Sequence, residues 1–368
     1  MTPHDPVPAG DRAAEPSATS PSKEHRGKPA APQGKRTARP AVGTAVAERP
    51  TAARKSTRWG VIAAKEFADN LLSVRFFVLL VILGLAAVAA VSTAASAIKG
   101  AASTASGTPS AFLLLFTAAP GSIPSFVSLV GFLGPLLGIA FAFDAITGER
   151  SQRTLPRLVS QPVYRDDVIN GKFVAGLAAV AVSVVAVMLV VAGVGILRLG
   201  ITPGPDDIAR LLVYLVLTVI YIGLWMAFAL LCSVTLRRAA TSALVAIAVW
   251  LILALFGLLL AGLLADLIAP IDAAGTAASQ IHHLQTEHTL SLVSPLNLYQ
   301  EATGALLNPQ VRAVGVVLPQ QTDQAVAGPL SFLQSMLVVW PQIVALVAAC
   351  VVVFAIAYVV FLRQEVRA

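Results

Sequence analysis

The residues with the clearest chemical pattern form a charged block between two long apolar segments. The block from Asp144 to Lys172 carries five basic and four acidic residues: Arg150, Arg153, Arg157, Arg165, Lys172, Asp144, Glu149, Asp166 and Asp167. The segments on either side hold almost no charge, so positive and negative side chains are concentrated here. Such a mixture is suited to ion pairing and to docking on another protein surface. We prefer ion pairing over acid–base chemistry for the carboxylates, because arginine partners lie close by.

A second polar group, Ile281–His288, contains His282, His283, Glu287 and His288. On a helix, His283 and Glu287 would share a face and His282 could join them, which suggests metal binding. No fourth ligand is fixed by the spacing, so a polar loop face is the simpler interpretation. We expect no bound metal.

Other catalytic patterns are absent from the sequence. No zinc-protease HExxH motif and no converging Ser/His/Asp or Cys/His set is present. Cys232 and Cys350 fall inside apolar runs without metal or redox spacing, which favours a packing role. The sequence therefore predicts no enzyme activity and no cofactor of its own.

The elements that must position the charged block are membrane spans. The chain is 57% hydrophobic and 12% charged, about half the charge of a typical soluble domain. A span needs about 20 mainly apolar residues. Six runs meet this length, near 76–96, 126–146, 173–197, 211–236, 239–268 and 337–362.

The spans are expected to be α-helices, because period-2 alternation is absent and an uninterrupted helix satisfies its own backbone in lipid. If alternate loops lie on opposite sides, 22 of the 26 Lys and Arg residues fall on the side of the N-terminus. The positive-inside rule then places both termini and the charged block in the cytoplasm. The same bias explains the net charge of +7, so we expect no nucleic-acid partner.

The N-terminal residues 1–55 are rich in Pro, Ala, Gly, Lys and Arg, which predicts a disordered basic tail. Order should begin at Arg58 with an amphipathic helix. Trp59, a headgroup-anchoring residue type, and Phe67 share its apolar face, whereas Lys65 lies opposite. This helix is either an ordinary juxtamembrane segment or an elbow that lies in the inner leaflet and leads into the first span.

Inside the charged block, Thr154–Val159 reads as a short amphipathic helix. Gly148 can end the preceding span, and Pro162 disfavours helix at Gln161. A short helix held against the membrane by two long spans is suited to act as a lever, because a force on it would tilt both spans.

At this point the chain resembles the permease subunits of ABC-2 type transporters. The resemblance covers the region from about residue 58 to the C-terminus, and includes the elbow residues Trp59, Lys65, Glu66 and Phe67, and Ser294-Pro295 followed by Tyr299. In the charged block the matching residues are Glu149, Arg150, Thr154, Leu155, Leu158, Ser160, Pro162, Arg165, Gly171 and Lys172. The end of the second span and the following loop are also similar to permeases of nitrous oxide reductase (copper enzyme) maturation transporters. This chain has Arg153 where most relatives have glycine.

The resemblance implies that the block holds a coupling helix, which contacts a separate cytoplasmic ABC ATPase subunit. None of the Gly-Lys pairs in this chain fits the GxxxxGK[ST] nucleotide motif, so ATP and Mg would bind the partner. The resemblance further implies a second permease copy or a paralogue, lipid contact, a location in the prokaryotic plasma (inner) membrane, and export.

Two features bear on the transport path. Gly134, Pro135 and Gly138 in the second span allow close helix packing and are also a possible hinge. No Asp, Glu, Lys or Arg lies deep within a predicted span, which argues against proton coupling and favours an apolar route. The short run Ala111–Phe116 is expected to be an interfacial or re-entrant piece of an outer loop, and 269–336 a long outer loop.

The sequence thus predicts an all-α polytopic membrane protein with six spans, acting as a permease subunit. Two alternatives stay open: a non-transporting anchor or sensor that recruits an ATPase, and a membrane-embedded enzyme.

Overall fold

The computed structural model describes residues 58–102, 111–151, 165–272, 275–315 and 328–364. Within these ranges the chain is mainly α-helical and no residue forms a strand. The helices are α1 (Arg58–Leu71), α2 (Val74–Ala102), α3 (Ala111–Thr117), α4 (Phe126–Ala142), α5 (Thr147–Ser151), α7 (Arg165–Leu199), α8 (Pro205–Thr235), α9 (Ala239–Ile268), α10 (Ala277–Ser291), α11 (Pro295–Leu307) and α13 (Phe332–Arg363).

Six helical segments are long and apolar enough to cross a membrane, which confirms the predicted fold class. They are Val74–Gly100, Phe126–Ser151, Asp166–Leu199, Pro205–Thr235, Ala239–Ile268 and Phe332–Arg363. Helix α7 begins at Arg165, two turns before the apolar run that marks it in the sequence. Its 35 residues span about 52 Å at 1.5 Å per residue. This exceeds the hydrocarbon thickness of about 30 Å, so the charged first turns have room outside the apolar layer.

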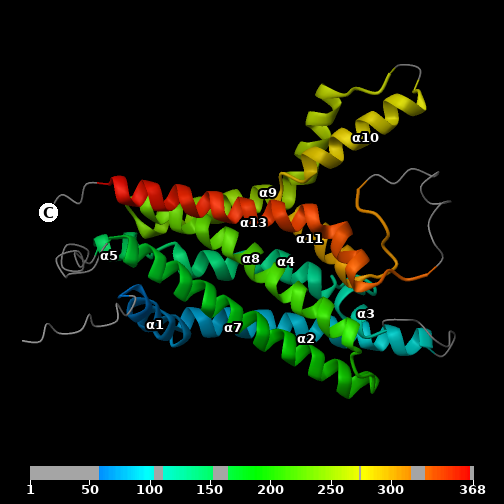
Figure 1. The fold of residues 1–368 in the computed structure, drawn as a ribbon, viewed down its shortest axis with the longest axis horizontal. Helices are drawn as coiled ribbons and strands as arrows, with labels where there is room; N and C mark the ends of the chain where they lie inside the picture. The colour runs from blue at the N-terminus through cyan, green and yellow to red at the C-terminus, as the bar shows by residue number, and fades with distance from the viewer. Residues whose placement is uncertain (1–57, 103–110, 152–164, 273–274, 316–327, 365–368) are drawn as a thin grey trace, which may run out of the picture. The chain divides into compact units, whose positions relative to one another are not determined.

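The long helices run side by side, with α8 in contact with α4, α7, α9, α11 and α13. Figure 1 shows α1, α5 and the last turns of α13 at one end of the bundle, and α3 and α11 at the other. We call these the α1 end and the α11 end. Both termini of the described chain therefore lie at the α1 end, as an even number of spans requires.

Helix α4 packs against α8 through its glycines. A Cβ added to Gly138 would lie 2.5 Å from the carbonyl oxygen of Ile222, and one added to Gly134 would lie 3.0 Å from the Ile222 side chain. Pro135, between them, is buried within the helix. Small residues here let two helices approach closely. The hinge interpretation of these residues stays a prediction.

Two short helices insert at the α11 end. Helix α3 buries Phe112, Leu113, Leu115 and Phe116, so the run expected to be interfacial or re-entrant is part of the core. Helix α11 packs against α4, α8, α9 and α13. Its Tyr299 ring stacks on Tyr221, with 4.3 Å between ring centroids. The predicted outer loop is therefore largely structured where it is described.

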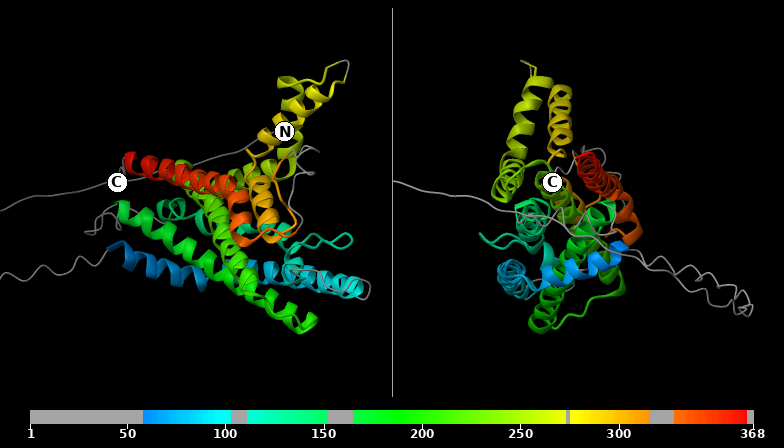
Figure 2. Two further views of the ribbon diagram at one scale, coloured as in Figure 1. Left: turned by 45° about the vertical axis from the view of Figure 1, so that its right-hand side comes forward. Right: turned by 90° about the vertical axis from the view of Figure 1, so that its left-hand side faces the viewer.

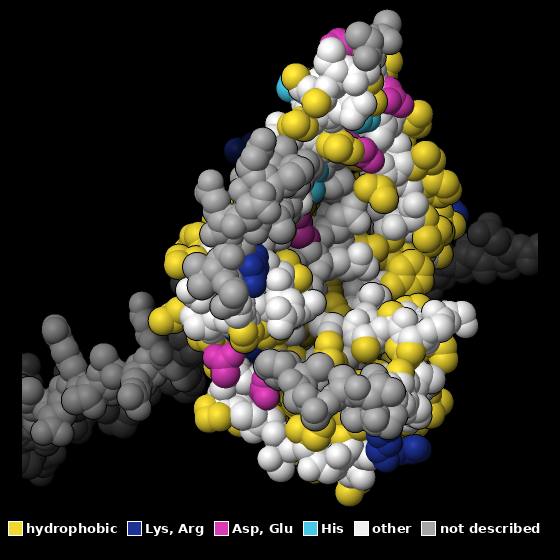
Figure 3. Space-filling model, turned by 90° about the vertical axis from the view of Figure 1, so that its right-hand side faces the viewer, with side chains coloured by type: hydrophobic (Ala, Val, Ile, Leu, Met, Phe, Trp, Pro, Cys, Tyr) yellow, Lys and Arg dark blue, Asp and Glu magenta, His cyan; other side chains and the backbone are white. Residues whose placement is uncertain are grey.

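The second half of α9 and helix α10 form a hairpin that projects away from the other helices (Figure 2). The second half of α9 exposes large apolar side chains, among them Leu258, Leu259 and Leu263. Histidine and acidic side chains appear on the part of the hairpin seen from the α11 end in Figure 3. His283 of α10 is buried, with Nδ1 2.9 Å from the carbonyl oxygen of Ala269.

Candidate functional site

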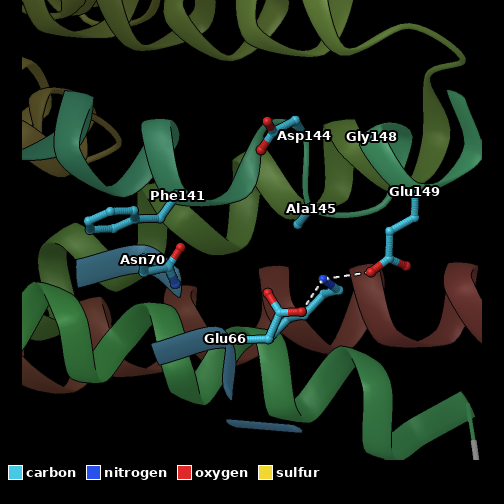
Figure 4. Close-up of a pocket in the computed structure, with 8 residues that line it drawn as sticks. Glu66, Asn70, Phe141, Asp144, Ala145, Gly148 and Glu149 are labelled. Atoms are coloured by element: carbon cyan, nitrogen blue, oxygen red, sulfur yellow. Dashed lines mark hydrogen bonds and ion pairs between the residues drawn. The ribbon is translucent and has the colours of Figure 1, made fainter. Parts of the chain in front are cut away.

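Three helical segments meet at a lysine at the α1 end. The Nζ atom of Lys172, in α7, lies 2.9 Å from Oε1 of Glu66 in α1 and 2.8 Å from Oε1 of Glu149 in α5. The Lys172 side chain is 9% exposed, against 26% for Glu66 and 16% for Glu149. Figure 4 shows both carboxylates directed toward this ammonium. We call Lys172, Glu66 and Glu149 the lysine cluster.

The amphipathic pattern of α1 explains how Glu66 reaches the cluster. Helix α1 packs along α7, and Glu66 is partly buried whereas Lys65 is exposed. On α7, Val168, Ile169 and Gly171 are buried just before Lys172. Apolar burial on both helices thus fixes their register, and the charges pair at the edge of that contact.

A polar pocket of about 190 Å³ lies beside the cluster. Asn70, Asp144 and Gly148 contribute to its lining together with the cluster, as Figure 4 shows. Asp144 also accepts a 2.6 Å hydrogen bond from Nη1 of Arg75, whose guanidinium lies 5.1 Å from the centre of the Phe143 ring. The start of α2 is thereby tied to the end of the second span.

The other side of α5 is anchored to the ends of α8 and α13. The hydroxyl of Ser233 accepts hydrogen bonds from the backbone N–H groups of Ile146, at 3.0 Å, and Thr147, at 3.1 Å. Arg150 donates to the carbonyl oxygen of Val234 at 3.1 Å and to the side chain of Gln364. The backbone N–H groups in the turn after α4 therefore find their hydrogen-bond acceptor on a residue distant in sequence.

This arrangement joins three helices through charged side chains. Each charged group in the cluster has an oppositely charged neighbour, and the contacts join α1, α5 and α7 directly. A displacement of α5 or of the start of α7 must therefore move the other helices or break an ion pair that is largely shielded from water.

The family comparison decides the class of the protein. Residues 60–366 match the family model described as ABC-2 family transporter protein. The chain belongs to this ABC-2 family. The match includes all but the first two residues of α1, the lysine cluster and all six candidate spans, and it confirms the resemblance seen in the sequence.

Two curated relatives match a shorter part of the ABC-2 chain. The probable ABC transporter permease protein NosY of Stutzerimonas stutzeri is 44% identical over 59 residues. The protein of the same description from Pseudomonas aeruginosa is 41% identical over 58 residues. Each alignment covers 16% of this chain and 21% of the relative. The chain thus aligns with about a fifth of the length of the curated relatives it matches.

The structure describes some of the predicted site residues, while others lie outside the described ranges. It brings Glu66, Glu149 and Lys172 together, and the side chain of Arg150 in α5 bonds the end of α8, while Gly171 is buried in α7. Within α1, Lys65 is exposed and Phe67 is partly buried. The helix residues Thr154, Leu155, Leu158, Ser160 and Pro162 lie outside the described residues, as do the side chains of Trp59 and Arg165.

The predicted hinge and the histidine group are separate from the lysine cluster. Gly134 and Gly138 pack against α8 further along α4, with Pro135 buried between them. His288 lies 2.7 Å from Glu301, and His283 bonds the backbone of Ala269. Among the residues that the structure describes, no group of His, Cys, Asp and Glu has metal-binding geometry.

Sequence reasoning missed several contacts of the site. Arg75 pairs with Asp144 across 69 residues of chain, and Ser233 and Gln364 hold α5. A usable signal existed for the first pair, because opposite charges stand where one span begins and the next one ends, at the same side of the membrane. No comparable signal marks Ser233 or Gln364, which are common residues near helix ends.

Proposed function

We infer that this ABC-2 family protein is the permease subunit of an ATP-driven exporter, whose ATP hydrolysis takes place on a separate cytoplasmic ATPase. Family membership supports the permease assignment. The relatives described as NosY permeases support a transporter of the same general kind. The positive-inside count supports a cytoplasmic α1 end in a prokaryotic plasma membrane.

The observation that carries the mechanism is the lysine cluster. Residues 152–164 connect α5 to α7, and Glu149 and Lys172 stand on either side of this connection. A motor protein that pushes on the connection would therefore transmit force to α5 and α7 through the Lys172–Glu149 ion pair. The Lys172–Glu66 ion pair would pass this force on to α1. The proposed lever is the Thr154–Ser160 segment, with Leu155 and Leu158 as its apolar contacts.

A pair of permease copies, or one copy with a paralogue, would complete the transporter. Broad apolar faces on α9 and α13 are suited to lipid and to helix partners. In this scheme ATP-driven closure of two motors rocks the second and third spans and opens a route for an apolar cargo. The protein itself has no catalytic role.

The test is co-purification of the chain with its ATPase and measurement of ATP-dependent transport in proteoliposomes. The double variant Leu155→Asp, Leu158→Asp should lose the ATPase from the complex. Leu72→Asp is the matched control, because Leu72 is 85% exposed at the junction of α1 and α2. Retention of both complex and transport in the double variant would contradict the coupling role. An anchor that only recruits the ATPase would form the complex without moving cargo.

A further inference from the structure

A second buried cation lies at the α11 end, far from the lysine cluster. Arg210 stands in the second turn of α8, and its side chain is fully buried. Its position in the sequence, just before an apolar run, suggests a loop charge at the membrane surface. The structure instead encloses it between α8, α11 and the start of α13.

Four partners surround the Arg210 guanidinium. Nε donates to Asp206 at 2.9 Å, and Nη1 donates to the carbonyl oxygen of Leu306 at 2.7 Å and to the hydroxyl of Ser335 at 2.8 Å. Nη2 donates to the carbonyl oxygen of Leu330 at 2.8 Å. These partners belong to α8, α11, α13 and the segment before α13, so one side chain ties four parts of the chain together.

The chemistry of the partners favours a positioning role. Leu306 lies in the last turn of α11, where carbonyl groups lack helical partners and a cation is stabilised by the helix dipole. Asp206 supplies the only carboxylate bonded to the guanidinium in the described structure, and its side chain is 57% exposed. If α11 moved away from α8, the buried Arg210 guanidinium would lose its hydrogen bond to the carbonyl oxygen of Leu306, and losing a hydrogen bond to a buried charged group is costly.

Helix α11 is the element that this cation holds in place. Tyr299 and Thr303 of α11 are fully buried, and the Tyr299 hydroxyl lies 2.9 Å from the hydroxyl of Thr218 in α8. We propose that Arg210 is a positioning residue that keeps α11 seated in the bundle, so that the α11 end stays closed while the guanidinium holds its four partners. The closing role rests on the proposed transport function.

The experiment measures access to a buried cysteine on α11. Cys232 and Cys350 are replaced by alanine, and Thr303→Cys is introduced into the purified full chain in detergent. A hydrophilic maleimide should label this cysteine slowly when Arg210 is present and at least tenfold faster in Arg210→Met. Arg210→Lys should be intermediate, because a lysine keeps the charge but cannot make the same set of bonds.

Matched controls separate a local effect from general loosening. Arg198→Met removes an exposed arginine from the end of α7 and should leave the labelling rate unchanged. A cysteine at the buried Ser183 of α7, made in place of Thr303→Cys, should not label faster in Arg210→Met. Equal Thr303→Cys labelling with and without Arg210, or equal acceleration at both cysteines, would overturn the proposal.

Milder variants cover the case in which Arg210→Met does not fold. Ser335→Ala and Asp206→Asn each remove one partner and should accelerate labelling at Thr303→Cys about twofold to fivefold. Unchanged rates in both variants would also overturn the proposal. Loss of ATP-driven transport in every variant and in the parent would contradict the proposed function, while the labelling difference would remain.

Discussion

Replacement of Lys172 by methionine tests the lysine cluster most directly, because it leaves two carboxylates facing each other. Each carboxylate oxygen lies within 2.9 Å of the same nitrogen, so the two oxygens are at most about 5.7 Å apart. At an effective dielectric constant of about 20, two unit negative charges at that distance repel by roughly 3 kcal/mol. Relaxation of the partly exposed Glu66 should reduce the net effect to about 2–3 kcal/mol.

The measurement is the thermal unfolding midpoint of the purified chain in detergent. For a domain of this size we expect Lys172→Met to lower Tm by roughly 5 °C. The control is Lys65→Met, which removes an exposed lysine from the neighbouring helix α1 and should change Tm by less than about 1 °C.

Charge removal on the other two members supplies the sharper test. The triple variant Lys172→Met, Glu66→Gln, Glu149→Gln has no carboxylate in the cluster. It should regain most of the lost stability, because the repulsion is gone and only the favourable contacts are missing. If the triple variant is no more stable than Lys172→Met, or if Lys172→Met unfolds at the same temperature as Lys65→Met, the electrostatic account of the cluster is wrong.

Three further changes follow from packing and hydrogen bonding, each measured by thermal unfolding in detergent. Gly138→Ala should destabilise the protein by about 1–3 kcal/mol, because the added Cβ meets the α8 backbone. Gly84→Ala is the control, because an added Cβ there meets open space, and it should be neutral or slightly stabilising. Equal effects of the two variants would contradict close α4–α8 packing. Tyr299→Phe removes the hydrogen bond to Thr218 and should cost about 1 kcal/mol; an unchanged midpoint would show that this bond contributes nothing. Arg75→Met breaks a pair whose arginine is 55% exposed and should cost less than about 1 kcal/mol, with a smaller effect at high salt; a larger, salt-independent loss would argue against a surface pair.

The spans could be predicted from the sequence because their signal is local. About 20 apolar residues in a row leave few alternatives to a membrane helix, and all six runs became helices. Their ends were less predictable. Helix α7 starts at Arg165 because the charged turns pack on α1, a contact between segments about 100 residues apart. Helices α3 and α11 are too short to be recognised as core elements from hydropathy alone.

The candidate site was predictable in part, for the same reason. Glu66, Glu149 and Lys172 stood out one by one, as charges beside apolar segments, but their convergence is a tertiary fact. Arg210 shows the opposite case. Its neighbours in sequence suggest that it is exposed. Its burial depends on the carbonyl groups of Leu306 and Leu330, and no local sequence pattern near residue 210 predicts these contacts.

The two buried cations differ in what they connect, and this difference suggests how the two ends behave. Lys172 joins α1 and α7 to α5 through charged side chains alone, so each contact is a separate pair that one substitution removes. Arg210 bonds mainly to backbone carbonyls and a hydroxyl, which no single partner substitution removes together. A force applied between α5 and α7 should therefore break the ion pairs of Lys172 at the α1 end one at a time. At the α11 end, the hydrogen bonds of Arg210 should break together.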